Sequence, residues 1–474
     1  MPHVWSDHAV LQRDQPIHVW GWANAGAAIT VGLHGQTATA TADRLGHWSA
    51  WLKPEKAGGP YALTVDGDGH VAVNDLLVGD VWLASGQSNM EFPMKGFVAA
   101  PLKNMDAEIA AANLPKVRLL LVHRNVTQVP VEDINDTWTV CTPETAKEFS
   151  AIAYFFGREI SAKEKVPIGL IDSTWGGTPA DAWTSMNTLG TDANLQSAFA
   201  ARAVFADQAI DQPARIAAKK REDALPGAVP RAEFFPEPRS YEPAGMYNAM
   251  IAPLTPLQIK GFLWYQGETE TSELRFTHYR TLFPALIADW RMHFAQGDLP
   301  FLFVQISSYE SGTNHVGLIR DTQRRALSAG NTAMAESLDV GEEHNIHPAD
   351  KQTVAARLAL AARAMVYGEH VAYQPPLFRM ATANDDGTMH VYFDHAEGLT
   401  ARNGTVGGFE IAGADGKYVA ADAKIDGETV VVKADAVKHP QYVRYGWAQW
   451  ETHFLYNAAG LPMSTFTNEA VPKQ

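Results

Sequence analysis

Two kinds of hydrophobic periodicity divide the chain, and the first marks the N-terminal region. Over residues 16–22, 28–33 and 61–65, apolar and polar positions come close to alternating, and short polar breaks separate the runs. A period of two is typical of β-strands with one buried face. We therefore predict a small β-sandwich over residues 1–77.

The second periodicity marks a central region, residues 78–374, in which strand-like runs alternate with helical patterns. In the helical stretches, apolar residues recur three or four positions apart, as they do at Tyr279, Leu282 and Leu286. Such alternation is typical of a parallel sheet between helices, so we predict a doubly wound α/β domain. Its six strands are expected at residues 77–84, 117–122, 167–173, 260–265, 301–306 and 332–338.

Three further segments complete the predicted organisation. Residues 199–225 are rich in alanine and in charge, which predicts an exposed helix. The five prolines of residues 226–245 predict an inserted loop or flap. Residues 375–474 return to strand-like runs. Because both ends of the chain are β-rich, one hypothesis is that residues 375–474 pack with residues 1–77 as a single module.

Length and composition limit the classes of protein to which this sequence can belong. A chain of 474 residues exceeds one ordinary hydrophobic core, so two or three domains are expected. Its 46% hydrophobic and 19% charged residues are typical of a well-packed globular protein. The net charge of −15 argues against nucleic acid and anionic membrane as partners, because both require a basic surface.

Cysteine content and apolar runs bear on the compartment of the protein. Cys141 is the only cysteine, which excludes an intrachain disulfide and a metal site built from cysteines. No apolar run approaches the roughly 18 residues needed to span a bilayer. Asp7, Arg13 and Asp14 interrupt the N-terminal segment, so it does not resemble a signal peptide. The pattern is compatible with a cytoplasmic protein and with one whose leader has been removed.

Residues 79–90, with the sequence GDVWLASGQSNM, place a serine just beyond a predicted strand. Gly86 breaks the strand in a tight turn, and Ser88 follows at its carboxyl end, where open α/β sheets bind their ligands. Ser88 is therefore a candidate nucleophile, with a helix-capping role as the alternative. Ser85 is a second candidate, but it lies nearer the strand and is expected to be buried. The elbow motif of α/β-hydrolases does not fit, because Met90 stands where that motif requires glycine.

His347 is a candidate general base. Pro348 follows it and suits the first turn of a predicted helix, whose dipole disfavours a positive charge on the imidazole. A neutral imidazole near pH 7 is what a general base requires. Helix capping is one alternative, and a metal site with His344, Glu342 and Glu343 is another. The proline places both histidines on a loop, however, and not on one helical face as in helix-borne zinc motifs.

Two other segments offer hydrogen-bond donors for an oxyanion. Gly176 and Gly177 end a strand in a turn that exposes backbone N–H groups, and Gln266 follows the next apolar strand with a side-chain amide. Ordinary turn-forming roles are the alternative for each. Because a doubly wound fold gathers the carboxyl ends of its strands in one crevice, these groups, with Ser88 and His347, would form an acyl-transfer site.

Taken together, these segments resemble the sialate O-acetylesterase family of the SGNH-hydrolase superfamily. The most specific motifs are Ser-Gly-Gln-Ser-Asn at residues 85–89 and Trp-Tyr-Gln-Gly-Glu at residues 264–268, and the resemblance extends over nearly the whole chain. It implies a flavodoxin-like catalytic domain with β-rich accessory parts, and removal of acetyl groups from sugars without a metal or organic cofactor. It also implies a periplasmic or secreted location.

The resemblance implies that Ser88 is the nucleophile and His347 the base, with Gly177 or Gly176, Gln266 and the Ser88 amide as oxyanion donors. One departure concerns the acid partner of the histidine. Many relatives have aspartate where this chain has Asn345, and asparagine cannot supply the negative charge that stabilises an imidazolium. We therefore expect a Ser–His dyad in which the backbone or the Asn345 side-chain carbonyl orients His347. Glu343 is the first reserve acid, and Glu342 and Asp339 are also near enough in sequence to reach the ring. Contacts to the substrate are expected from Gln87, Asn89, Trp175, Trp264 and Glu268.

The function predicted from these residues is hydrolysis of acetyl esters on carbohydrate hydroxyl groups through a covalent acetyl-enzyme. The sequence leaves the sugar open between O-acetyl sialic acid and acetylated xylan or other hemicellulose, and it leaves the oligomeric state open. A glycan-binding protein that has lost turnover is one alternative. A metal-dependent deacetylase that uses His344 and His347 is the other.

Overall fold

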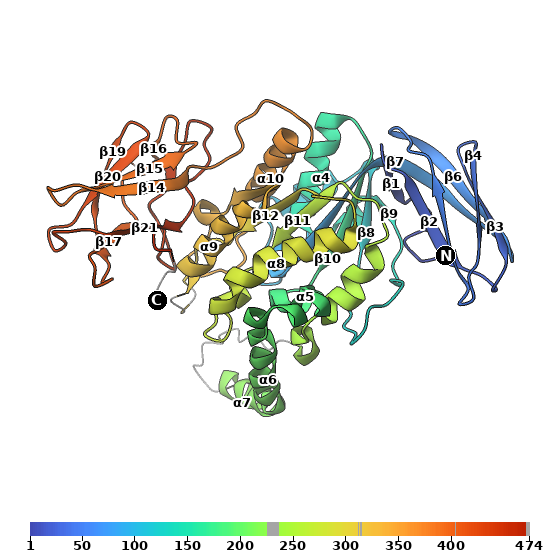
Figure 1. Ribbon diagram of the computed structural model, residues 1–474, viewed down its shortest axis with the longest axis horizontal. Coiled ribbons are helices and arrows are strands. Elements are labelled where there is room, and N and C mark those ends of the chain that lie inside the picture. The colour runs from blue at the N-terminus through green and yellow to red at the C-terminus, as the bar shows by residue number, and fades with distance from the viewer. Residues whose placement is uncertain (225–236, 311, 313–314, 403, 471–474) are drawn as a thin grey trace.

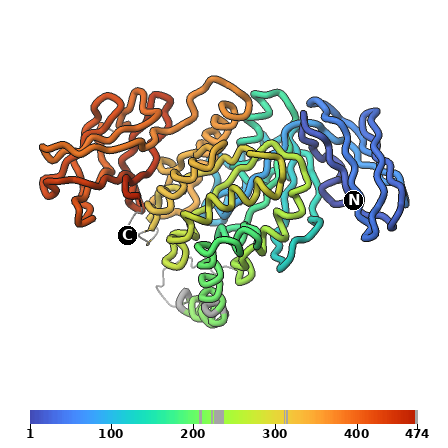
Figure 2. Tube along the Cα trace, in the orientation of Figure 1, coloured from blue at the N-terminus to red at the C-terminus, as the bar shows by residue number. Residues whose placement is uncertain are grey.

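The computed structural model describes residues 1–474 except 225–236, 311, 313–314, 403 and 471–474. An N-terminal β-rich region, a central α/β region and a C-terminal β-rich region follow one another along the longest axis (Figure 1). The two β-rich regions lie at opposite ends of the molecule (Figures 1 and 2), so the hypothesis that they form one module is wrong. The central sheet and its helices separate them.

The central sheet consists of six parallel strands in the order β13-β12-β11-β7-β10-β8, with β9 antiparallel at the β8 edge. The parallel α/β architecture predicted from the alternating pattern is confirmed. The six predicted parallel strands are present, but the flavodoxin-like arrangement that the resemblance implied is not confirmed, because such a sheet has five strands and β8 adds a sixth outside β10. The strands are β7 (His70–Gly86), β8 (Leu114–Leu121), β9 (Thr139–Cys141), β10 (Ile168–Thr174), β11 (Gly261–Tyr265), β12 (Phe301–Gln305) and β13 (Thr332–Glu336).

Helices cover the sheet, and β10, β11 and β12 are buried along their whole length, as expected for strands enclosed on both faces. The helices α4 (Ala151–Glu164) and α10 (Lys351–Met365) pack together on one side of the strands. On the other side lie α8 (Phe276–Phe294) and α9 (Val316–Arg325) (Figure 1). Shorter helices are α1 (Ser88–Glu91), α2 (Met105–Ala110), α3 (Pro143–Ala146) and α5 (Met186–Thr191).

Strand β7 joins the N-terminal region to the central region. Its first half pairs antiparallel with β6 (Gly58–Asp66), and its last residues pair in parallel with β10 and β11. The boundary expected at residues 77/78 therefore falls inside one 17-residue strand. Buried residues of both regions belong to one continuous hydrophobic core.

The rest of the N-terminal region confirms the predicted strands and forms two small sheets. In one, β3 (Ala28–Leu33) pairs with β4 (Gln36–Thr41) and β6, and β1 (Val10–Gln12) lies parallel to β7. The other consists of β2 (Ile17–Trp22) and β5 (His47–Leu52). Side chains from this second sheet reach the central region, as described below.

The C-terminal region has a hydrophobic core of its own. One sheet has the order β14-β15-β20-β19, a second has the order β18-β17-β21-β23, and a two-stranded sheet pairs β16 with β22. These strands are β14 (Leu377–Ala383), β15 (Met389–Asp394), β16 (Thr400–Ala401), β17 (Phe409–Ala412), β18 (Val419–Ala420), β19 (Asp422–Asp426), β20 (Thr429–Lys433), β21 (Tyr442–Tyr445), β22 (Leu455–Tyr456) and β23 (Phe466–Thr467).

The segment after α5 contains two helices, α6 (Ser197–Ile210) and α7 (Gln212–Asp223), where the alanine-rich pattern predicted one. Of the predicted proline-rich loop 226–245, residues 226–236 lie outside the described residues, and Pro238–Tyr241 form a 3₁₀ helix. Across the described residues, no helix combines the length and the apolar character that a membrane span requires.

Candidate active site

Ser88 stands at the point where β7 ends at the carboxyl edge of the sheet. Gly86 has a φ of +135°, and a Cβ atom there would lie 2.1 Å from the carbonyl oxygen of Tyr265. Only glycine fits this close approach, which turns the chain so that α1 begins at Ser88. Ser85 is fully buried in the strand, as expected from its position.

A cavity of about 950 Å³ opens beside Ser88, and His347 lines it as well. Its floor comes from segments that follow β7, β10, β11 and β13, the edge at which an α/β sheet binds ligands. Residues of α6 and α7 complete one wall. The fold thus brings Ser88 and His347 together in one cavity although they are far apart in the sequence. Among the predicted substrate contacts, Gln87, Trp175 and Glu268 also line it.

His347 is half-buried and held by its surroundings. The ring of Phe97 packs edge-to-face against the imidazole, with 4.9 Å between ring centroids. The backbone N–H of His347 donates to Asn345 Oδ1 at 3.0 Å. Burial, together with the charge of nearby Lys351, lowers the pKa of His347 to about 4. The imidazole is therefore neutral at physiological pH and has a lone pair with which to accept a proton.

None of the residues considered as an acid partner bonds to the imidazole ring. The side chain of Asn345 bonds to the backbone of His347, since its Nδ2 donates to the His347 carbonyl oxygen at 2.9 Å. The same Nδ2 donates to Glu342 Oε2 at 3.0 Å. Glu342 in turn accepts from the Ala349 N–H. Glu343 is half-exposed and lies beside His344, and Asp339 is paired with Arg357, so the expectation of Glu343 as reserve acid is wrong.

Asn345 and Glu342 instead form a hydrogen-bonded turn that fixes the backbone of His347. We expect Asn345→Asp to leave kcat unchanged or lower it, because the new carboxylate would face Glu342 and not the imidazole. Loss of the two donated hydrogen bonds should lower the free energy of unfolding by about 1–3 kcal/mol. Urea denaturation with kcat measured in parallel checks this. A higher kcat in the variant would show that the side chain at 345 reaches the ring.

The backbone around Ser88 contains two candidate oxyanion donors. The N–H groups of Ser88 and Gly177 donate no hydrogen bond to any other described residue. Gly176 differs, since its N–H donates to Glu91 Oε2 at 2.8 Å. A Cβ atom on Gly176 would lie 2.8 Å from Glu91 Oε2 and 3.1 Å from the Ser88 Cβ, so glycine lets the turn pack closely against both residues. Gly177 is therefore the better of the two predicted glycine donors.

Gln266 does not take the predicted place in the oxyanion hole. Its side chain is fully buried and outside the cavity, and its Nε2 donates to Glu270 Oε1 at 3.0 Å and to the Thr178 carbonyl oxygen at 3.3 Å. Both of its N–H groups are thus used to join the loops that follow β10 and β11. The reason is burial: a side-chain amide in the core must satisfy its donors within the protein.

Asn89 and Trp264 do not line the cavity, so the prediction that they contact the substrate is wrong. Trp264 is fully buried and packs edge-to-face against Trp183 and Trp290. Asn89 is fully buried too, and it connects three segments of the site. Its Nδ2 donates to Glu268 Oε1 and to the Ile346 carbonyl oxygen, and its Oδ1 accepts from Lys351 Nζ at 2.6 Å. Asn89 therefore ties the serine turn to the histidine loop.

Lys351 is the residue of this network that the sequence analysis missed. It is buried at the first position of α10, with Nζ 4.5 Å from the ring centroid of Phe92, and burial lowers its pKa to about 7. Burial likewise raises the pKa of Glu268, whose Oε2 has no hydrogen-bond partner among the described residues. One signal was present in the sequence. Lys351 stands only four residues after His347, at the predicted start of the helix, so the two were expected to lie near each other.

Charged residues on the cavity wall are largely paired. Arg124 pairs with Glu91, and its guanidinium lies over the Trp175 ring at 5.6 Å from the centroid. Arg275 pairs with buried Asp181. Neither arginine has a local signal in the sequence, because its partner lies far away along the chain.

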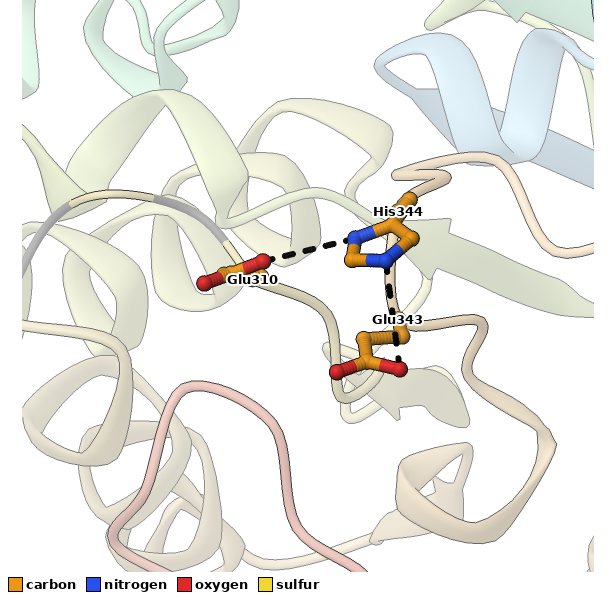
Figure 3. Close-up of side chains that lie close together, drawn as sticks. All are labelled: Glu310, Glu343 and His344. Carbon is orange, nitrogen blue, oxygen red and sulfur yellow. Dashed lines mark ion pairs between the residues drawn. The ribbon is translucent and has the colours of Figure 1, made fainter.

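The proposed metal pair, His344 and His347, is divided between two environments. His344 lies on the surface beside Glu310 and Glu343, with its Nδ1 3.3 Å from Glu310 Oε2 (Figure 3). These three exposed residues are the one group of potential ligands, among the described residues, whose donor atoms all lie within 4.8 Å. His347 is not a member and faces the cavity instead.

Comparison with known proteins agrees with this geometry. A family model described as carbohydrate esterase, sialic acid-specific acetylesterase, matches residues 228–365. The mouse sialate O-acetylesterase is 29% identical over 94% of this chain and 89% of its own length, and the human one is 32% identical over 78% of this chain and 71% of its own length. A crystal structure of a carbohydrate acetylesterase from Xanthomonas citri aligns with a TM-score of 0.85 and 37% identity over 99% of both chains. The chain therefore belongs to the sialate O-acetylesterase family and is a carboxylic ester hydrolase.

Proposed function

We propose that the protein removes O-acetyl groups from carbohydrates by a serine mechanism in which Ser88 is the nucleophile and His347 the general base. The observation that carries the proposal is the cavity that both side chains line, next to two backbone N–H groups that donate no hydrogen bond within the described part of the chain. The names of the relatives, sialate O-acetylesterase and carbohydrate acetylesterase, support an acetylated carbohydrate as the substrate.

In the first half of the reaction, His347 takes the proton from the Ser88 hydroxyl as Oγ attacks the acetyl carbonyl carbon. The negative charge that develops on the carbonyl oxygen is stabilised by the N–H groups of Ser88 and Gly177. Each such donor typically contributes roughly 10²–10³ in rate. The protonated imidazole then gives its proton to the departing sugar oxygen. Water repeats these steps on the acetyl-enzyme and releases acetate.

A Ser–His dyad suits a base of low pKa. Without a carboxylate behind it, the imidazolium is less stable than in a triad, but the neutral base is fully available over a wide pH range. The orientation that an aspartate usually provides is supplied here by the Asn345 hydrogen bond to the backbone and by the ring of Phe97.

Charge in the cavity favours a neutral sugar over an anionic one. Among the described residues, three arginines and three glutamates line it, so these residues give no excess of positive charge toward a bound carboxylate. Two of the arginines, Arg124 and Arg275, are already paired with carboxylates. The residues that contribute charge are Arg124, Arg215, Arg275, Glu91, Glu237 and Glu268.

The substrate is tested by measuring acetate release from acetylated xylo-oligosaccharides and from O-acetyl sialates at equal concentration. We expect faster release from the neutral oligosaccharides. A fluorophosphonate that reacts with serine should abolish the activity, whereas EDTA should leave it intact. Loss of activity in EDTA with resistance to the fluorophosphonate would favour the metal-dependent alternative, and absence of release from any ester would favour the glycan-binding one.

A further inference from the structure

A second cavity, of about 630 Å³, lies where the N-terminal β region meets the central region. Its walls come from β2 and β5 on one side, and from residues 128–132, 185–187 and 247–256 on the other. It shares no lining residue with the cavity beside Ser88. Its volume falls within the range that is common for sites that bind small organic ligands. We call it the junction cavity.

The junction cavity presents aromatic side chains, above all Trp22 at the end of β2. Trp22 is 37% exposed, and its Nε1 donates to Glu132 Oε2 at 3.0 Å, which fixes the indole across the junction. Trp20 and Tyr247 line the cavity as well. An indole ring that is held at its polar edge keeps its apolar faces for contact with a ligand.

Most polar side chains of the junction cavity end in planar hydrogen-bonding groups, and Ser185 and Thr255 add hydroxyl groups. Glu132 is the one carboxylate, and no lysine or arginine occurs among the described residues that line the cavity. Such a site repels anions and offers both donors and acceptors to hydroxyl groups. The other planar polar residues are His47, Gln128, Asn187, Asn248 and His293.

We propose that the junction cavity is a second, non-catalytic binding site for a neutral oligosaccharide, in which a sugar ring stacks on Trp22. A pyranose ring has an apolar face of C–H groups and an edge of hydroxyl groups, which match the indole face and the planar polar groups. The proposal rests on the proposed function in that the ligand is of the substrate's chemical class. Such a site would raise the local concentration of a long substrate near Ser88 without taking part in the reaction.

The test uses variants of Trp22 and a matched control on the same small sheet. Trp51, on β5, is more exposed than Trp22 at 52%, stacks on His18 and does not line the junction cavity. Binding of xylohexaose, which carries no acetyl group, is measured by calorimetry for the full chain and for Trp22→Ala and Trp51→Ala. We expect at least about tenfold weaker binding for Trp22→Ala and no change for Trp51→Ala. Hexagalacturonate, an anionic chain of equal length, should bind none of them.

Kinetics provide a second measurement. Trp22→Ala should raise KM for acetylated xylan several-fold, while kcat for p-nitrophenyl acetate, which is too small to span both sites, stays unchanged. If Trp22→Ala proves unstable, Val129→Arg serves in its place. Val129 lines the cavity from a loop and is 67% exposed, so an arginine side chain there should fill the mouth of the cavity. It should weaken xylohexaose binding in the same way.

Several outcomes would overturn the proposal. One is equal binding of xylohexaose by wild type, Trp22→Ala and Val129→Arg. A second is no binding by wild type. A third is a dimer in sedimentation that depends on Trp22, since the cavity would then be an interface between two copies of the chain. The result is independent of catalysis. If Ser88→Ala leaves acetate release unchanged while Trp22-dependent binding persists, the serine mechanism fails and the junction site stands.

Discussion

The Ser88→Ala variant is expected to release acetate at least about 10⁴-fold more slowly than wild type, with the fold intact. The size of the effect follows from the proposed acetyl-enzyme, because removing a nucleophile abolishes the covalent route and leaves only the contribution of the oxyanion donors and binding. The fold should persist, since the turn depends on Gly86 and on backbone hydrogen bonds and not on the Ser88 hydroxyl. Initial rates on p-nitrophenyl acetate and on acetylated xylo-oligosaccharides measure the effect.

Ser85→Ala is the matched control, three residues earlier in the same motif. Its hydroxyl is buried and has no hydrogen-bond partner among the described residues, so its removal should change neither the rate nor the melting temperature appreciably. Equal rates for wild type and Ser88→Ala would refute the serine mechanism. A large loss of rate in folded Ser85→Ala would indicate that Ser85, before the turn, is the nucleophile and that Ser88 is not.

The second large effect is expected at His347, where His347→Gln should lower kcat roughly 10³-fold or more. The pH dependence of wild type is equally diagnostic. Because burial and Lys351 lower the pKa of His347 to about 4, the base stays unprotonated as the pH falls. The value of kcat/KM should therefore remain level from neutral pH down to about 5, and decline only as the imidazole becomes protonated.

Two variants separate this interpretation from a general effect of acid on the fold. Lys351→Met removes a positive charge close to the imidazole, which raises the pKa of His347 and moves the acid limb to higher pH. His344→Gln, on the exposed cluster of Figure 3, should leave both the rate and the pH profile unchanged. A wild-type acid limb near pH 6.5 would show that the imidazole behaves as a solvated one. A loss of activity in His344→Gln would return attention to the metal alternative.

Local patterns predicted most of the fold because they depend on near neighbours in the chain. All six central strands appear within a few residues of the expected positions, with one large difference at β7. The apolar run at 77–84 showed only the half of β7 that is buried in the central sheet. The preceding residues, 70–75, are mostly exposed because they pair with β6 at the surface of the N-terminal region, and their assignment to the same strand depends on that partner.

The same distinction applies to the site. The sequence by itself placed Ser88 beyond a glycine turn and His347 before a helix, because strand ends, tight turns and helix starts have local chemical signatures. It did not distinguish Asn89 and Gln266, which are buried connectors, from side chains that face the cavity. A polar residue next to a motif serves either purpose, and burial by distant segments decides which.

Tertiary structure alone decided how His347 is held and what surrounds it. The Lys351–Asn89–Glu268 network, the pairing of Glu91 with Gly176 and the junction cavity each join segments that are far apart in the sequence. No periodicity records such contacts, since they depend on which groups the packed chain brings within hydrogen-bonding distance and removes from water. The candidate reactive residues, Ser88 and His347, could therefore be predicted from the sequence, whereas the groups that surround them were determined by the folded arrangement.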